Sequence, residues 1–190
     1  MIIEIKKKLY HGSYTIVDKP DLSKCGIGKD FGQGFYLTTD IDQARRFVRS
    51  SIGKAAKNGK CDLKQSNGFI SVFELSGIED LVCYEFGTAD REWLHCVAMH
   101  RRNGLFAEQL KKWDRYDVIV GKIANDNTNQ VITAYINGVY GEVGSDIADR
   151  TAIGLLMPDK LTDQICVITD KALQRLIFSG SEEVVVKERS

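Results

Sequence analysis

The stretch that decides the fold is Asp30-Phe31-Gly32-Gln33-Gly34-Phe35-Tyr36-Leu37-Thr38-Thr39-Asp40, read together with Leu9-Tyr10-His11-Gly12-Ser13 upstream of it. The upstream segment predicts a strand that ends in a polar His-Gly-Ser tip, and the downstream segment predicts a second strand entered through a glycine loop. A helix is expected next, because Thr39 or Asp40 can cap it and apolar residues recur at helical spacing from Ile41 to Val48.

The remaining elements mix short strands and helices without a strict strand–helix–strand order. Strands are expected at residues 6–12, 32–38, 68–75, 116–121 and 164–168. Helices are expected at 40–57, at 90–102, after a cap at Asn125 or Asp126, and from a cap at Asp170 through Leu176. Residues 182–188 either close a sheet or trail off. This pattern predicts an α+β fold with largely antiparallel sheets, in a single domain over residues 1–190. A Rossmann fold is excluded. Gly-x-Gly occurs at Gly26 and Gly28 and at Gly32 and Gly34, but neither pair is followed by a third glycine that opens a helix after a buried strand.

Composition narrows the class of protein. The 190 residues include 26 basic and 26 acidic side chains, so the chain lacks the net charge that drives nonspecific nucleic-acid binding. No apolar run approaches the roughly 20 residues that span a bilayer, and residues 1–8 do not resemble a secretory signal. The five cysteines form no C-x-x-C pair, which indicates buried, reduced thiols. We therefore expect a cytoplasmic protein with no membrane partner.

A metal site is not expected from the histidines of the predicted 90–102 helix. His95 and His100 are five residues apart, which does not place both on one helix face.

Three segments together carry a resemblance to a known family. Leu9–Ser13, Phe31–Tyr36 and Asp42–Phe47 resemble the core of the ADP-ribosyltransferases, in the poly(ADP-ribose) polymerase and diphtheria-toxin branch, whose signature is a histidine, a tyrosine and an acidic residue. The chain is also similar to a group of small bacterial, toxin-like members of that superfamily, through residues 116–126 and 164–166. The resemblance implies a split β-sandwich of largely antiparallel strands with flanking helices.

The resemblance also implies an activity. The implied activity is mono-ADP-ribosyl transfer: NAD is the co-substrate, nicotinamide is released, and a macromolecule, either protein or nucleic acid, is modified. The bacterial group implies the toxin of a toxin–antitoxin or defence pair, with a small antitoxin protein as partner. Two other readings share the cleft: an NAD glycohydrolase with water as acceptor, and a catalytically degenerate module that binds NAD, ADP-ribose or another protein.

Site residues follow from the matched motifs. Tyr36 corresponds to the tyrosine that stacks on nicotinamide, and Phe47, eleven residues later, corresponds to the aromatic residue on the other face of that ring. The backbone of Gly12 corresponds to the position that holds the carboxamide. His11 corresponds to the residue that binds a ribose hydroxyl of the adenosine half, with Ser13 as a neighbouring support.

The third signature position departs from the family, because Gln164 stands where an acidic residue is expected. An amide can accept a hydrogen bond and orient the ribose, but it carries no charge against the developing oxocarbenium. The resemblance therefore implies slow turnover or a single transfer rather than chain extension. Asp163 and Glu108 are other sources of negative charge, although strand alternation sends Asp163 to the opposite face.

Overall fold

The computed structural model describes residues 8–123, 126–157 and 161–186. Its elements in chain order are β1 (Leu9–Ser13), η1 (Leu22–Lys24), β2 (Phe35–Leu37), α1 (Ile41–Lys57), β3 (Asn67–Leu75), β4 (Cys83–Glu85), α2 (Arg91–Arg101), α3 (Ala107–Leu110), β5 (Val118–Lys122), α4 (Asp126–Ile136), α5 (Asp146–Leu156), β6 (Asp163–Val167), α6 (Asp170–Leu173) and β7 (Leu176–Val185).

The strands form two sheets. One has the order β1-β3-β7 and is antiparallel throughout, and the other has the order β2-β6-β5-β4, with a parallel pair only between β4 and β5. The expected α+β fold with largely antiparallel sheets is confirmed. The edge strands β1 and β2 belong to different sheets and are linked by one isolated bridge, between Tyr10 and Thr38.

The two sheets pack face to face, because both carry apolar residues on their inner sides. Leu9, Phe73 and Leu75 from the first sheet share one buried cluster with Phe35, Leu37, Val118, Val120, Ile165 and Val167 from the second. Helix α1 covers the outer side of the first sheet, where Ala44, Val48 and Ile52 pack against Ile70. The fold therefore has a sandwich of sheets with a helix on its outer side.

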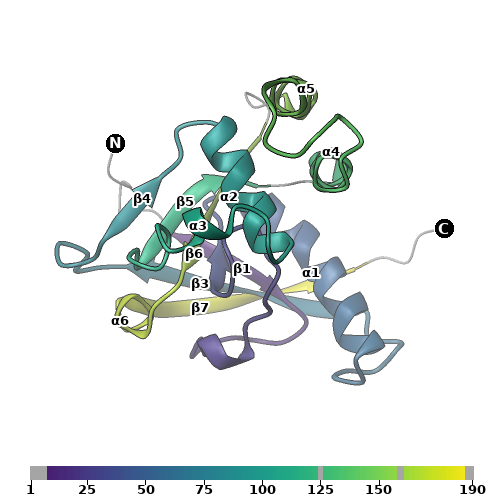
Figure 1. The fold of residues 1–190 in the computed structure, drawn as a ribbon. Coiled ribbons are helices and arrows are strands. Elements are labelled where there is room, and N and C mark those ends of the chain that lie inside the picture. The colour runs from purple at the N-terminus through teal and green to yellow at the C-terminus, as the bar shows by residue number, and fades with distance from the viewer. Residues whose placement is uncertain (1–7, 124–125, 158–160, 187–190) are drawn as a thin grey trace.

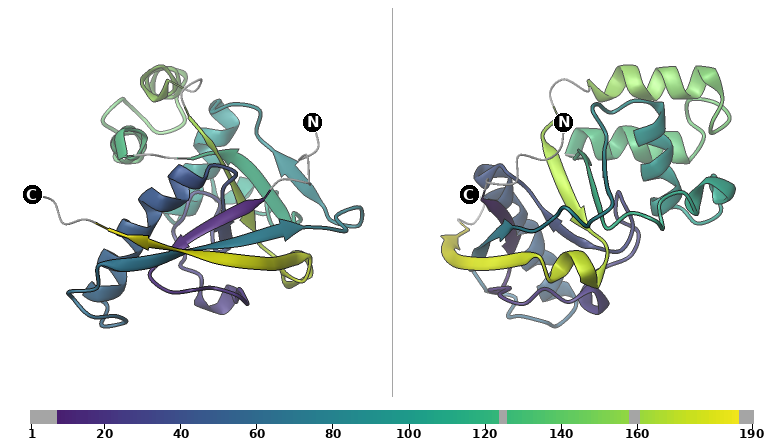
Figure 2. Two further views of the ribbon diagram at one scale, coloured as in Figure 1. Left: turned by 180° about the vertical axis from the view of Figure 1, so that it is seen from behind. Right: turned by 90° about the vertical axis from the view of Figure 1, so that its left-hand side faces the viewer.

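The outer side of the second sheet is covered by the other long helices. The buried side chains on this side include Trp93, Leu94 and Val97 of α2, Ile132 and Tyr135 of α4, and Ala148 and Ala152 of α5, which pack with Ile119 and Cys166. Figure 1 shows α4 and α5 at the end of the molecule opposite to β3 and β7, and Figure 2 shows the two helices side by side. The molecule is thus layered as helix, sheet, sheet and helices.

Several local predictions are confirmed. Asp40 caps α1, because its side chain accepts hydrogen bonds from the backbone N–H groups of Asp42 and Gln43. The helix expected at residues 90–102 is α2, and the Asp90 side chain caps it by accepting from the backbone N–H of Trp93. Residues 182–185 continue β7 and pair with β3, so they close the sheet.

Other predictions need correction. Thr169, rather than Asp170, caps α6, and this helix ends at Leu173 because Leu176 already begins β7. The sequence analysis did not predict η1, β4, α3 or α5. The first three have three or four residues each, and α5 follows glycines 138, 141 and 144, which are typical of a loop and all have positive φ. The predicted cap at Asn125 lies outside the described residues.

The cysteine prediction holds in part. All five thiols are free, but only Cys96 and Cys166 are buried, while Cys83 is exposed on β4. Within residues 8–123, 126–157 and 161–186, no helix has both the length and the apolar character needed to cross a membrane.

Candidate functional site

The candidate site lies where the edges of the two sheets separate. Tyr10 and Thr38 exchange both backbone hydrogen bonds, N to O at 2.8 and 3.0 Å. If the antiparallel ladder continued, Gly12 would come opposite Tyr36. Instead the Nδ1–H of His11 donates to the Tyr36 carbonyl at 2.8 Å. The ladder therefore stops after one bridge and leaves a gap between β1 and β2.

Gly12 presents its backbone to this gap. Hydrogen-bonding directions alternate along a strand, so the N–H and C=O of Gly12 point to the same edge as those of Tyr10, away from β3. Its α-carbon lies against α1: a Cβ at this position would be 2.0 Å from the Ala44 carbonyl oxygen and 3.2 Å from the Cβ of Phe47. Only glycine permits this contact between strand and helix.

Phe47, the residue predicted to pack on the nicotinamide ring opposite Tyr36, belongs to α1 and lies beside Gly12 of β1. It is 43% exposed, although Ala44 and Val48 on the same helix are fully buried. The ring therefore contributes little to the core of the fold. A half-exposed aromatic ring next to a free backbone edge is available to a flat ligand.

His11 is fixed in one orientation. Its ring packs on Phe35 with centroids 4.4 Å apart, and its Nδ1 must carry the proton because a carbonyl only accepts. Burial lowers the pKa of His11 below its ordinary value, and the nearby Lys29 charge lowers it further, although the bond to Tyr36 acts against both. His11 is therefore neutral near pH 7, and its Nε2 is an acceptor.

Tyr36 connects β2 to the glycine loop. Its hydroxyl donates to the Gly32 carbonyl at 2.9 Å and accepts from the Phe31 N–H at 2.9 Å. Burial raises the pKa of Tyr36 well above its ordinary value, so the hydroxyl stays protonated. The tyrosine thus holds the loop in place, a role that the sequence did not predict.

Ser13 ends β1 and pairs with Phe69 of β3. It is buried, and strand alternation places its side chain on the same face as His11.

Gln164 lies on β6, and strand alternation places it on the same face of the sheet as Cys166, the partner of Tyr36. Its side chain is buried, and Nε2 donates to Asp30 Oδ2 at 2.7 Å and to the Lys122 carbonyl at 3.2 Å. No donor among the residues that the structure describes reaches its Oε1. The amide oxygen is thus free to accept a hydrogen bond from a ligand.

Asp30 and Arg101 are the residues that the sequence reasoning missed. Asp30 lies beside the glycine loop in the sequence, where nothing indicates a role for it. In the structure it contacts Gln164 and forms an ion pair with Arg101 of α2, with 2.5 Å between the Arg101 guanidinium and Oδ1. No motif signals this contact, because the partners lie 134 and 71 residues away in the chain.

The two other carboxylates considered from the sequence do not join Gln164. The Asp163 carboxylate is half exposed and pairs with the Lys122 ammonium at 3.0 Å, on the other side of β6, as strand alternation predicts. Glu108 is exposed on α3, which packs against α2. The negative charge next to Gln164 comes from Asp30.

Two lysines give this side of the molecule positive charge. Lys29 precedes Asp30 in the glycine loop and lies close enough to His11 and to Lys54 of α1 for their charges to interact. Burial and the Lys54 charge both lower the pKa of Lys29. The Asp30 charge acts in the opposite direction on the pKa of Lys29.

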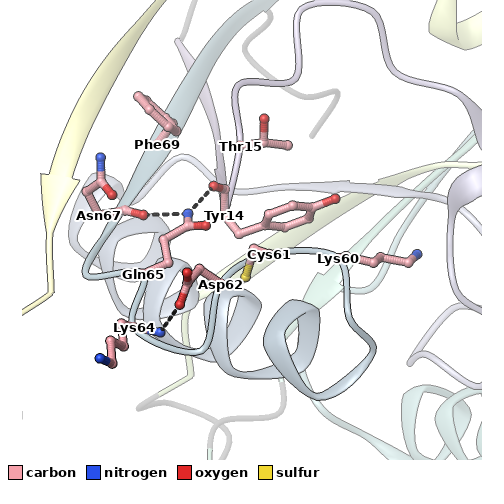
Figure 3. A pocket seen from close by; sticks show the side chains of 9 residues that line it. All are labelled: Tyr14, Thr15, Lys60, Cys61, Asp62, Lys64, Gln65, Asn67 and Phe69. Atoms are coloured by element: carbon pink, nitrogen blue, oxygen red, sulfur yellow. Dashed lines mark hydrogen bonds between the residues drawn. The ribbon is translucent and has the colours of Figure 1, made fainter.

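An open pocket of about 620 Å³ lies at the end of β1, shown in Figure 3. Tyr14, Lys60 and Lys64 are among its lining residues, and none of the predicted site residues lines it. Gln65 also lines it, and its side-chain amide donates to the carbonyls of Tyr14 and Asn67, at 2.7 Å each. The pocket adjoins the predicted cluster but is separate from it.

Within the described residues, no group of three or more His, Cys, Asp or Glu side chains has an arrangement that could hold a metal ion.

Comparison with known proteins gives one family. A family model described as "Protein of unknown function (DUF3990)" matches residues 7–178, a range that contains every predicted site residue. No curated protein matches the chain.

Proposed function

The chain belongs to the DUF3990 family, and we propose that it is a mono-ADP-ribosyltransferase that transfers ADP-ribose from NAD to a macromolecule and releases nicotinamide. In this proposal the two sheets are an ADP-ribosyltransferase-like split β-sandwich. One observation carries it: β1 and β2 separate after the bridge between Tyr10 and Thr38, and His11 and Tyr36 of the predicted signature meet at that separation.

The nicotinamide end of NAD fits the gap by hydrogen-bond complementarity. A carboxamide has one carbonyl acceptor and an N–H donor, and Gly12 offers a backbone N–H and C=O on one edge. Phe47 beside Gly12 and Tyr36 across the gap supply aromatic surface for a flat ring. The positive charges of Lys29 and Lys54 suit the diphosphate.

His11 and Gln164 suit the two riboses, because both present acceptors. The neutral Nε2 of His11 accepts from a hydroxyl of the adenosine ribose, and the free Oε1 of Gln164 accepts from a hydroxyl of the nicotinamide ribose. In the reaction, the bond from C1′ to the nicotinamide nitrogen breaks, and its electron pair leaves with neutral nicotinamide. The acceptor forms the new bond to C1′ and loses its proton to solvent.

The test uses NAD labelled on the adenylate phosphate, incubated with the protein in cell lysate. Transferred label that disappears with protease or with nuclease identifies the class of acceptor and supports the proposal. Nicotinamide release without transfer means an NAD glycohydrolase. If neither nicotinamide release nor transferred label is detected, the proposed transferase activity is wrong and a binding module is favoured.

Phe47→Ala tests the site itself, with Ile147→Ala as the matched control. Both side chains are exposed, at 43% and 76%, so both variants should fold. Loss of the stacking surface should raise the KM for NAD about threefold to tenfold in Phe47→Ala. An unchanged KM would contradict this placement of nicotinamide.

A further inference from the structure

We propose that Asp30 acts through Gln164 and supplies the negative charge that the third signature position lacks. This inference rests on the proposed transferase function. Asp30 is then a positioning residue, because its carboxylate contacts the glutamine side chain rather than the substrate.

The orientation of Gln164 follows from its two hydrogen-bond partners. A glutamine amide can present either its oxygen or its nitrogen to a ligand. Here the Asp30 carboxylate, at 2.7 Å, and the Lys122 carbonyl, at 3.2 Å, can only accept, so both must face Nε2. The oxygen is therefore directed away from them and is left for a ligand to use.

Asp30 also changes the charge distribution of that oxygen. A carboxylate that accepts from Nε2 polarises the amide and makes Oε1 a stronger acceptor, most of all in a buried site. Asp30 is 8% exposed and Gln164 is 5% exposed, so water screens this contact little. An electron-rich oxygen fixed beside C1′ stabilises the oxocarbenium-like transition state.

Arg101 fixes the carboxylate from its other side. Its Nε and one terminal nitrogen donate to Asp30 Oδ1, at 2.9 and 2.5 Å, and its second terminal nitrogen donates to Asn129 of α4 at 2.6 Å. Asp30 stands between the guanidinium and Gln164, so the negative end of the ion pair faces the amide. Helix α2 thereby sets the position of a residue on a glycine loop.

This arrangement explains why Gln164→Glu alone should not restore an efficient site. A glutamate at this position would place a second carboxylate against that of Asp30 and would remove the donors to Asp30 and Lys122. The exchange Asp30→Asn with Gln164→Glu keeps one acid and one amide in contact, with their positions reversed. Its net charge equals that of the natural chain.

The experiment compares Asp30→Asn, Gln164→Glu, the double exchange and Asp163→Asn by nicotinamide release at varied NAD. Asp163 is the matched control, because it is a carboxylate next to Gln164 that pairs with Lys122 on the other side of the strand. Asp30→Asn and Gln164→Glu should each lower kcat about tenfold to a hundredfold, with the KM for NAD changed less than about threefold. The double exchange should recover most of the lost kcat, and Asp163→Asn should remain within about twofold of the natural chain.

A readout independent of activity is the side-chain amide signal of Gln164 in ¹H–¹⁵N NMR spectra. The signal should shift in Asp30→Asn and remain in place in Asp163→Asn. If Asp30→Asn does not fold, the double exchange decides: a folded protein with less than about a tenth of the natural kcat overturns the inference.

The remaining outcomes separate the two proposals. Natural chain that neither releases nicotinamide nor transfers label overturns the proposed function, and this inference with it. Active natural chain with an equally active Asp30→Asn variant overturns only the role of Asp30.

Discussion

Replacing Gly12 with alanine tests the contact between β1 and α1 that underlies the site. The added Cβ would lie 2.0 Å from the Ala44 carbonyl oxygen, and real Cβ atoms do not approach closer than 3.0 Å, so strand and helix must move apart by about 1 Å. The obstacle is helix backbone, which cannot rotate aside as a side chain does. Moving α1 would also loosen the packing of Val48 on Ile70.

The expected cost follows from overpacking in well-packed cores. Forced displacement of this kind costs typically 1–3 kcal/mol, and the short distance to backbone places Gly12→Ala near the upper end, at about 3 kcal/mol. That is a large part of the roughly 5–15 kcal/mol by which a domain is stable. Urea unfolding followed by circular dichroism measures it.

Gly53→Ala is the control. Gly53 lies in the same helix and is exposed, and the Cβ of an alanine there would have no neighbouring atom within 4 Å. This variant should stabilise the protein by about 0.5–1 kcal/mol, because alanine favours helix interiors over glycine. A Gly12→Ala variant whose free energy of unfolding lies within about 0.5 kcal/mol of the natural chain would refute the close contact of α1 with β1 and the free backbone edge inferred from it.

Three further predictions concern stability and thiol chemistry. Asp149→Asn should lower the free energy of unfolding by about 3 kcal/mol, because Asp149 is fully buried and bonded to His95, Tyr135 and Arg91, whereas Asp146→Asn at the surface should stay within about 1 kcal/mol in the same urea titration. Burial lowers the pKa of His11 and His100, so the unfolded chain binds more protons than the folded chain below about pH 6.5, and stability should fall from there down to the folded pKa values; a His11→Asn variant should lose less between pH 7.5 and 5, and an equal loss would contradict the partly buried, neutral His11. Iodoacetamide should label Cys83 before Cys96 and Cys166, since the first is exposed while burial raises the pKa of the Cys166 thiol to about 12; mass spectrometry that finds Cys166 labelled as fast as Cys83 would count against its burial.

Local signals in the sequence predicted those parts of the fold that depend on neighbouring residues. Helix α1 was predictable because its cap, its apolar spacing and its length all lie within one segment. The proximity of Gly12 and Phe47 could be inferred from the family motifs, because both residues lie in segments that resemble the ADP-ribosyltransferase core. Strand β4 was missed because it has three residues and pairs in parallel with a distant strand.

The partner of Gln164 could not be predicted for a different reason. Its carboxylate comes from a loop whose glycines indicated only a turn, and the loop is held by Arg101 from α2 and by the Tyr36 hydroxyl. Such a contact depends on how the sheets and helices pack, which no local pattern records. The sequence therefore predicted the amide at the third position and left out the acid that accompanies it.

The separation of β1 from β2 also has a consequence for stability. Gly12 does not pair with the peptide group of Tyr36, whose carbonyl accepts from His11 instead, so in the free protein water must satisfy the N–H and C=O of Gly12. A ligand amide bound here would form these hydrogen bonds and so connect the edges of the two sheets. Substrate would then stabilise the folded protein, and the unfolding temperature should rise with the concentration of substrate.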